Sequence, residues 1–240
     1  MLSIIIPTLN EEHYLPKLLD SIKRQTFKDY EVIIVDSNSE DRTKKVANSY
    51  KKKIKYLKFI QKNKRNISYQ RNKGVELAKG SILIFLDADG ILPSKFLEEI
   101  LKGLKKKKLD IAAVCLIPIS KNIIDKFLYI IANSFFFAFQ KIFPHCAGNC
   151  IIAKKEVHKK IKGFKEDIKL GEDHNYAKRA AKHFKFGVLS TKMYISNRRY
   201  IQDGRLITSL KYFIAFFHRL FLGEIKSDIF GYKFGHYKQK

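Results

Sequence analysis

The sequence has no tryptophan, only three cysteines and only five prolines among its 240 residues. The three cysteines are too few, and odd in number, to form a disulfide framework. The chain opens on a strand-like run and not on a charged and then apolar signal peptide. These features predict a protein of the reducing cytoplasm. His145, Cys146 and Cys150 in PHCAGNC have no second pair at zinc spacing, so we interpret the two cysteines as small buried residues.

Acidic residues are also scarce, since 23 aspartates and glutamates stand against 48 lysines and arginines, which gives a net charge of +25. This excess predicts a polyanionic partner or an anionic membrane surface. A general lysine bias with no partner is an equal alternative. The basic residues are spread over many segments, and zinc-finger, homeodomain and RNP signatures are missing, so we expect no nucleic-acid partner.

An apolar run long enough to span a bilayer is lacking as well. The strongly apolar segment Phe127–Phe139 has only 13 residues between Lys126 and Gln140, whereas the hydrocarbon layer is about 30 Å thick. It is either a core helix or a segment at the bilayer interface. The same two alternatives hold for an amphipathic helix predicted at Gly204–Leu222.

What the first half contains is an alternation of short apolar runs with amphipathic stretches, which is typical of βαβ units. The length of the whole chain, 240 residues, fits one domain, or a core domain with a small appendage. The pattern predicts an α/β fold with a Rossmann-like, mostly parallel sheet flanked by helices. The predicted strands are Leu2–Pro7, Tyr30–Asp36, Ile54–Ile60, Ser81–Leu86 and Ile111–Pro118.

Three of these strands end at polar clusters. In open α/β sheets the ligand crevice lies outside the carboxyl ends of the strands, so we expect the clusters to converge there. Two carboxylates after one strand suit Mg²⁺ or Mn²⁺, while the alternative is a turn or helix cap before Pro93. The clusters are Thr8, Asn10 and Glu11 after the first strand, Asp36 after the second, and Asp87 and Asp89 after the fourth.

Five motifs follow one another in a fixed order: IIIPTLNEE, VIIVDSNSEDRT, YQRNKGVELAKG, SILIFLDADG and GEDHNYAKRA. In this order they resemble a family 2 glycosyltransferase of the GT-A fold over roughly residues 1–200. The resemblance implies a nucleotide-binding half at 1–118 and an acceptor-binding half at 119–200. Residues 201–240 would then form an amphipathic helix and a basic tail, packed on the domain or on the membrane.

The resemblance also implies roles for individual residues around a UDP- or GDP-linked sugar. Asp36 is otherwise a turn former in DSNS, and Arg71 is otherwise a solvated helix residue. The implied base and ribose contacts are Pro7, Thr8, Asn10, Glu11 and Asp36. Arg71 would lie near the base, Asp87 would contact the nucleotide, and Asp89 together with Asp87 would hold the Mg²⁺ or Mn²⁺.

A second acidic pair, Glu172 and Asp173, opens a predicted helix, where acids are also stabilised by the helix dipole. The resemblance implies that Asp173, beside Glu172, is the catalytic base for an acceptor hydroxyl, with inversion of the sugar. Arg198, Arg199 and Arg205 in SNRRYIQDGR follow a predicted strand, where their guanidinium groups, that of Arg199 above all, could bind either the leaving diphosphate or an anionic acceptor. Ser196 and Tyr200 depart from the Gln and Trp of the motif that processive relatives carry, which argues against a processive synthase.

Together these inferences predict a metal-dependent, inverting transferase that acts on a lipid-linked or glycan acceptor, peripheral on the cytoplasmic face of the membrane. One alternative is a polyprenyl-phosphate (dolichyl-phosphate) sugar synthase, whose phosphate acceptor scarcely needs a base. A nucleotidyltransferase would be expected to carry a glycine-rich loop, which IIIPTLNEE lacks. A basic nucleic-acid-binding module would leave the ordered acidic strand ends unexplained.

Overall fold

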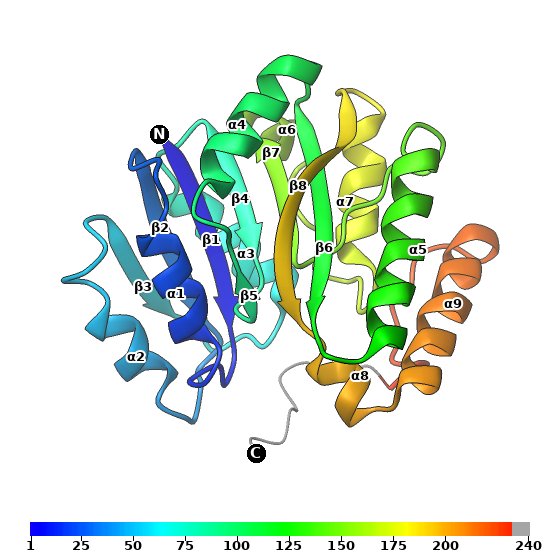
Figure 1. Cartoon of the computed structure of the whole chain (residues 1–240), viewed down its shortest axis with the longest axis horizontal. Helices are drawn as coiled ribbons and strands as arrows, with labels where there is room; N and C mark the ends of the chain where they lie inside the picture. The colour runs from blue at the N-terminus through cyan, green and yellow to red at the C-terminus, as the bar shows by residue number, and fades with distance from the viewer. Residues whose placement is uncertain (232–240) are drawn as a thin grey trace.

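A computed structural model describes residues 1–231 as helices that flank a single mixed sheet (Figure 1). The strands are β1 Leu2–Thr8, β2 Tyr30–Asp36, β3 Leu57–Gln61, β4 Ile82–Leu86, β5 Gly90–Ile91, β6 Ile111–Ile119, β7 Cys150–Lys154 and β8 Phe186–Ser196. The helices are α1 Leu15–Lys23, α2 Thr43–Ser49, α3 Ile67–Leu77, α4 Phe96–Lys107, α5 Ile123–Phe139, α6 Lys155–Lys160, α7 Glu172–Ala181, α8 Arg198–Gln202 and α9 Arg205–Phe221.

The sheet is mostly parallel and runs in the order β3-β2-β1-β4-β7-β6-β8-β5. β1 pairs in parallel with both β2 and β4, so that Ile5 lies opposite Ile33 and Phe85. β7 enters between β4 and β6 and is antiparallel to both. The carboxyl ends of β1, β2 and β4 therefore meet at one edge, as the sequence predicts.

Helices cover both faces of the sheet, which is why all seven residues of β1 are buried. Ile4 and Ile6 pack in one cluster with residues of α1, α2 and α4. Ile5 points to the other face and packs in a second cluster with Val75 of α3 and residues of α6 and α7. These two layers fix the strand ends on which the site is built.

Two helices, α5 and α9, are different because their apolar side chains remain exposed. Asp125 is the only buried residue of α5, whereas Phe127 is 60% exposed. In α9 only Thr208 and Ala215 are buried. Neither helix is therefore a core helix. Over residues 1–231, no helix has the length and apolar character that a membrane span requires.

Some elements differ from the sequence-based prediction. The third strand begins at Leu57 and not at Ile54, because the backbone N–H of Ile54 bonds the carbonyl of Tyr50 and continues the preceding helical turn. β7 and α4 were not predicted. β7 has only five residues and no flanking pattern that separates it from a buried helical turn.

Candidate active site

A cavity of about 1170 Å³ lies at the carboxyl ends of β1 and β4, with α3, α5, α7, α8 and α9 around it. Its charged side chains come from segments that are far apart in the sequence, and the fold brings these segments together. The predicted site residues that line it are Pro7, Glu11, Arg71, Asp87, Asp89, Glu172, Asp173 and Arg199.

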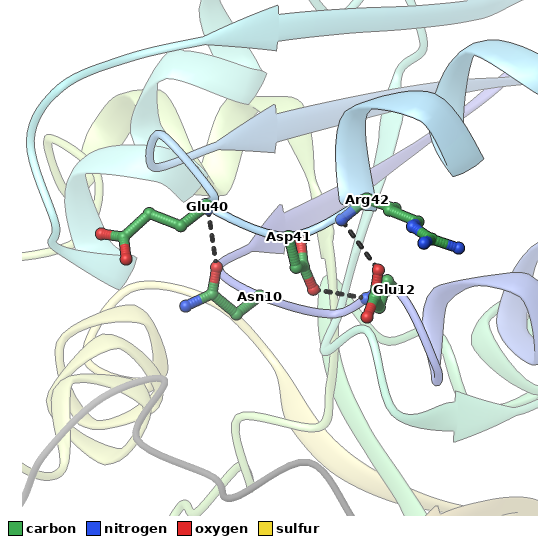
Figure 2. A pocket seen from close by; sticks show the side chains of 5 residues that line it. All are labelled: Asn10, Glu12, Glu40, Asp41 and Arg42. Carbon is green, nitrogen blue, oxygen red and sulfur yellow. Dashed lines mark hydrogen bonds between the residues drawn. The ribbon is translucent and has the colours of Figure 1, made fainter.

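Three predicted residues lie outside this lining. Asp36 is fully buried and accepts hydrogen bonds from Thr8 Oγ1 at 2.8 Å and from the backbone N–H of Ser39 at 2.8 Å. Asn10 lies in a smaller hollow of about 510 Å³ formed by the loops after β1 and β2 (Figure 2). Thr8 and Asp36 thus join the two strand ends.

The smaller hollow in Figure 2 shows how these two loops are held together. Asn10 has a positive φ of 57°, and its Oδ1 accepts from the backbone N–H of Glu40 at 2.9 Å. Glu12 accepts from the N–H of Arg42 at 2.8 Å and donates its own N–H to Asp41 at 3.0 Å. The loop that carries Glu11 is therefore fixed from both sides.

Arg71 of α3 is the central cation of the site and is fully buried. Its Nη1 donates to Glu172 Oε1 at 2.8 Å, and its Nη2 donates to Asp87 Oδ1 at 3.0 Å and to the carbonyl of Gly148 at 3.0 Å. The planar guanidinium can serve several acceptors at once, which a lysine cannot do. Arg71 therefore ties the end of β4 to the start of α7.

Glu172 and Asp173 form the first turn of α7, which follows Gly171 at a φ of 85°. Burial, together with the neighbouring charge of Asp173, raises the pKa of Glu172 to about 7. Burial also raises the pKa of Asp173, while Arg71 and Arg219 act in the opposite direction. A carboxylate with a raised pKa is a better proton acceptor near neutral pH.

Gly148 marks the point at which three charged groups meet. A Cβ added at this position would lie 3.0 Å from Arg71 Nη2, 3.3 Å from Asp173 Oδ2 and 3.7 Å from Asp87 Oδ2. The close approach leaves no room for a side chain without moving one of these groups. The backbone of the CAGN turn thus forms part of the site.

Arg198 of α8 links the ends of β1 and β4. It donates to both oxygens of Glu11, at 2.9 and 2.6 Å, and its Nε lies 3.1 Å from Asp89 Oδ2. Burial raises the pKa of Glu11 to about 7 even though Arg198 lowers it. Burial likewise raises the pKa of Asp89, and the nearby Asp87 adds to this effect.

The donor set at the end of β4 fits a hard divalent cation. Asp87 and Asp89 line the same cavity, where burial and the charge of Asp87 raise the pKa of Asp89 although Arg198 lowers it. Within residues 1–231 no group of three or more His, Cys, Asp or Glu side chains is arranged around a common ion. Two carboxylates leave the remaining positions of Mg²⁺ or Mn²⁺ to phosphate oxygens and water.

Three further residues of the site were not among the predicted ones. His145 and His174 line the cavity with ring centroids 3.3 Å apart, and burial lowers the pKa of both well below the ordinary value. Arg219 of α9 lies over Gly171 and faces the carboxylate of Asp173. Cys146 and Cys150 are buried, as predicted.

A known protein family shares the sequence that carries these charged strand ends. Residues 3–162 match the sequence profile described as Glycosyl transferase family 2, which covers more than half of the chain. The chain belongs to glycosyl transferase family 2. The matched range ends at residue 162. The cavity residues from α7, α8 and α9, such as Glu172 and Arg198, therefore lie outside it.

Relatives with curated names share parts of the sequence. The chain is 35% identical over 130 residues to the GalNAc(5)-diNAcBac-PP-undecaprenol beta-1,3-glucosyltransferase of Campylobacter jejuni, covering 52% of this chain and 41% of that protein. It is 44% identical over 93 residues to a PGL/p-HBAD biosynthesis glycosyltransferase of Mycobacterium bovis, covering 38% and 36%. The matches thus span less than half the length of these relatives.

Solved structures share the fold. A mannosyltransferase of Pyrobaculum calidifontis in complex with GDP-Man and Mn²⁺ superposes with a TM-score of 0.74 at 20% identity, covering 94% of this chain and 65% of that one. TarS 1-349 of S. aureus in complex with UDP-GlcNAc gives 0.69 at 22% identity, covering 82% and 58%. The mixed sheet and its flanking helices are therefore a GT-A fold.

Proposed function

We propose that this family 2 protein is a glycosyltransferase that moves a sugar from a UDP- or GDP-linked donor to an acceptor hydroxyl, with inversion at the anomeric carbon. One observation carries the proposal. The carboxylates of Glu11, Asp87, Asp89 and Asp173 line one cavity, together with arginines whose guanidinium groups can bind a diphosphate.

In this proposal Asp173 is the general base. It takes the proton of the acceptor hydroxyl as that oxygen attacks the anomeric carbon on the face opposite the diphosphate, and a single displacement inverts the sugar. Burial raises the pKa of Asp173, which suits it to accept a proton. Arg71 positions Glu172 and Asp87 through its hydrogen bonds.

Asp87 and Asp89 are the residues that would hold Mg²⁺ or Mn²⁺. When bound, the cation stabilises negative charge on the departing diphosphate. Glu11 and Pro7 line the cavity and would contact the ribose and the base. Thr8, Asn10 and Asp36 lie outside that lining and in this proposal hold the strand ends and loops in place through the hydrogen bonds of Asp36 with Thr8 and of Asn10 with Glu40. Arg198 and Arg199 line the cavity at the end of β8, where guanidinium groups can donate to the diphosphate oxygens.

The acceptor in this proposal is lipid-linked or otherwise close to the membrane, and the protein is peripheral on the cytoplasmic face. The Campylobacter relative carries PP-undecaprenol in its name. In this chain, one wall of the cavity is apolar and aromatic, with Phe135 and Phe136 from α5 and Phe216 from α9. In the same proposal, residues 1–118 bind the nucleotide and residues 119–200 bind the acceptor.

A polyprenyl-phosphate acceptor is the second candidate, and Arg219 favours it. This arginine lines the cavity beside Asp173 and could neutralise an acceptor phosphate. The two candidates differ in their need for a base. Asp173→Asn should abolish transfer to a hydroxyl of a lipid-linked saccharide, but should reduce transfer to a polyprenyl phosphate far less. Product identification by mass spectrometry distinguishes them.

Calorimetry with UDP, GDP and their sugar conjugates, with and without Mn²⁺, tests the proposed donor. We expect binding that requires Mn²⁺ and that is lost in Asp89→Ala. Glu98→Ala, an exposed acid of α4 far from the cavity, is the matched control and should bind as wild type. The absence of nucleotide binding under every condition would contradict the proposal. NMR of the product's anomeric proton tests inversion.

A further inference from the structure

The helices α5 and α9 present an apolar surface that the described residues leave uncovered. Their most exposed apolar side chains include Leu206 at 87%, Ile123 at 78% and Phe221 at 75%. Such exposure over many neighbouring residues is typical of an interaction site. We define the α5–α9 apolar surface as Ile123, Phe127, Ile130, Phe137, Leu206, Leu210, Leu220 and Phe221.

The two helices lie side by side (Figure 1). Phe216 of α9 contacts α5 and the turn after it, with ring centroids 6.3 Å from Phe135 and 6.3 Å from Phe143. In α5 the residues of this surface are spaced four, three and seven apart, which places them on one face. In α9 the exposed Leu206, Leu210, Phe213, Phe217 and Leu220 are spaced three or four apart in the same way. Each helix has 17 residues, a length of about 25 Å.

The charged residues of the two helices indicate which kind of partner fits this surface. In residues 120–143 and 204–222 the single acidic residue is Asp125, which is buried and bonded to Arg205 at 2.7 Å. Within these two segments the exposed charged residues are all cationic: Lys121, Lys126, Lys141 and Lys211. An apolar face bordered by lysines fits an anionic bilayer. A second copy with a charge of +25 would be repelled.

The surface also continues into the cavity. Ile131, Phe213 and Phe217 are 50%, 60% and 39% exposed, and all three line the cavity as well. An apolar chain lying against α5 and α9 could therefore pass from the exterior to the acidic residues without crossing a polar barrier at these three positions.

We propose that the α5–α9 apolar surface lies in the headgroup and acyl boundary of an anionic bilayer, about 5–10 Å deep. The lipid part of the acceptor then enters the cavity from the membrane along Ile131, Phe213 and Phe217. The delivery of an acceptor rests on the proposed function, whereas docking on the bilayer can be tested without any chemistry.

Co-sedimentation with vesicles tests the docking. The full chain should sediment with vesicles that contain phosphatidylglycerol, sediment less with pure phosphatidylcholine, and be partly released by salt. The double variant Phe127→Ser/Leu210→Ser replaces two exposed residues outside the cavity lining and should lower the partition coefficient about tenfold or more. Tyr56→Ser, 52% exposed next to β3, is the matched control and should behave as wild type.

Three outcomes would overturn the inference. The wild type could remain in the supernatant with anionic vesicles at low salt, or the double variant could sediment as the wild type does. Light scattering could also reveal a dimer that the double variant dissociates, which would make the surface an interface between copies. Nucleotide calorimetry on the same samples separates the two proposals: lost vesicle binding with retained UDP or GDP binding refutes only the docking, and the reverse refutes only the proposed function.

Discussion

Gly148 is the single residue on which the geometry of the site depends most directly. Gly148→Ala would place a methyl group 3.0 Å from the guanidinium of Arg71 and 3.3 Å from the carboxylate of Asp173. We expect turnover to fall by up to about tenfold, because these groups must move by a few tenths of an ångström and a shift of roughly 1 Å in a catalytic group can cost about a hundredfold. The melting temperature should stay close to that of wild type, and steady-state kinetics with thermal melts would measure both.

Gly103→Ala is the control for this variant. Gly103 lies in α4, and its added methyl would meet the flexible end of Leu189 at 2.8 Å, away from the cavity. We expect unchanged turnover. If Gly148→Ala were as active as Gly103→Ala, the convergence around Gly148 would have no part in the reaction.

Two buried glutamates predict how activity depends on pH. The pKa values of Glu11 and Glu172 are raised to about 7, and the pKa of Asp173 is raised by burial. Since these groups act as carboxylates, kcat/KM should rise between about pH 5 and pH 8, with its midpoint well above the ordinary carboxyl range. A profile that is complete by pH 5 would contradict this. Glu76→Gln, on the surface of α3, should leave the profile unchanged.

The free energy of unfolding should fall as the pH rises, whereas kcat/KM should increase. A carboxyl whose folded pKa exceeds its unfolded value of about 4.5 favours folding below that value, and this contribution is lost as pH rises through about 7. The free energy of unfolding of the ligand-free protein should therefore fall across this window. Thermal melts at several pH values would test it, and Glu11→Gln should flatten the curve.

The acidic residues were the part of the site most open to prediction, since Asp87, Asp89 and Glu11 directly follow apolar strands. Arg219 was not predicted, because nothing local in its segment distinguishes it, and His145 was considered only as a metal ligand and set aside. An arginine near the end of an amphipathic helix normally satisfies the helix dipole or faces water. Only the folding of α9 against α7 brings Arg219 over Gly171.

Among the helices, α7 depends on the backbone of Gly171 and α9 on that of Gly204, both with φ of 85°. Replacing either by alanine should cost about 1–3 kcal/mol, because L residues rarely adopt this conformation. An added Cβ at Gly171 would also lie 2.8 Å from Arg219, whereas at Gly204 it would meet only Ile207 at 3.8 Å. Gly171→Ala should therefore lose far more activity than Gly204→Ala.

Turnover with a short-chain acceptor and chemical denaturation would measure the two effects separately. The two glycines share φ but differ in ψ, which is 27° at Gly171 and 139° at Gly204. Alanine is strained more at Gly204, so Gly204→Ala gives an upper limit for the effect of backbone strain alone. Equal losses of activity in both variants would mean that the contact between Arg219 and the start of α7 is unimportant.

The elements themselves were predicted where the hydrophobic period is clear. β1, β2 and β4 were expected within a few residues of their observed bounds, because parallel strands buried on both faces read as continuous apolar runs. β7 and α5 were harder to predict from the sequence. A five-residue strand is too short to classify, and the aromatic side chains of α5 give no indication of whether protein or another medium covers them.

For the chain as a whole, nucleotide binding should appear as added stability. At a concentration of about 100 times the Kd, a ligand that binds only the folded state adds about 2.7 kcal/mol, which raises the melting temperature by several degrees. We expect this rise with UDP or GDP in the presence of Mn²⁺ and its loss on addition of EDTA. Asp89→Asn should lose the metal-dependent part, and a rise unaffected by EDTA would exclude the proposed metal site.

The pairing of Arg198 with Glu11 also has a consequence for how the protein folds. The two residues lie 187 positions apart, and Arg71 and Glu172 lie 101 apart. Contacts of such separation carry a high loop-closure entropy and form late. The parallel strands β1, β2 and β4 can associate while the chain is still being synthesised, but the charges of the cavity balance only after α8 has emerged. A nascent chain that ends before Arg198 would leave Glu11 without this partner, so the charges around the nucleotide site are complete only after residue 198 has been synthesised.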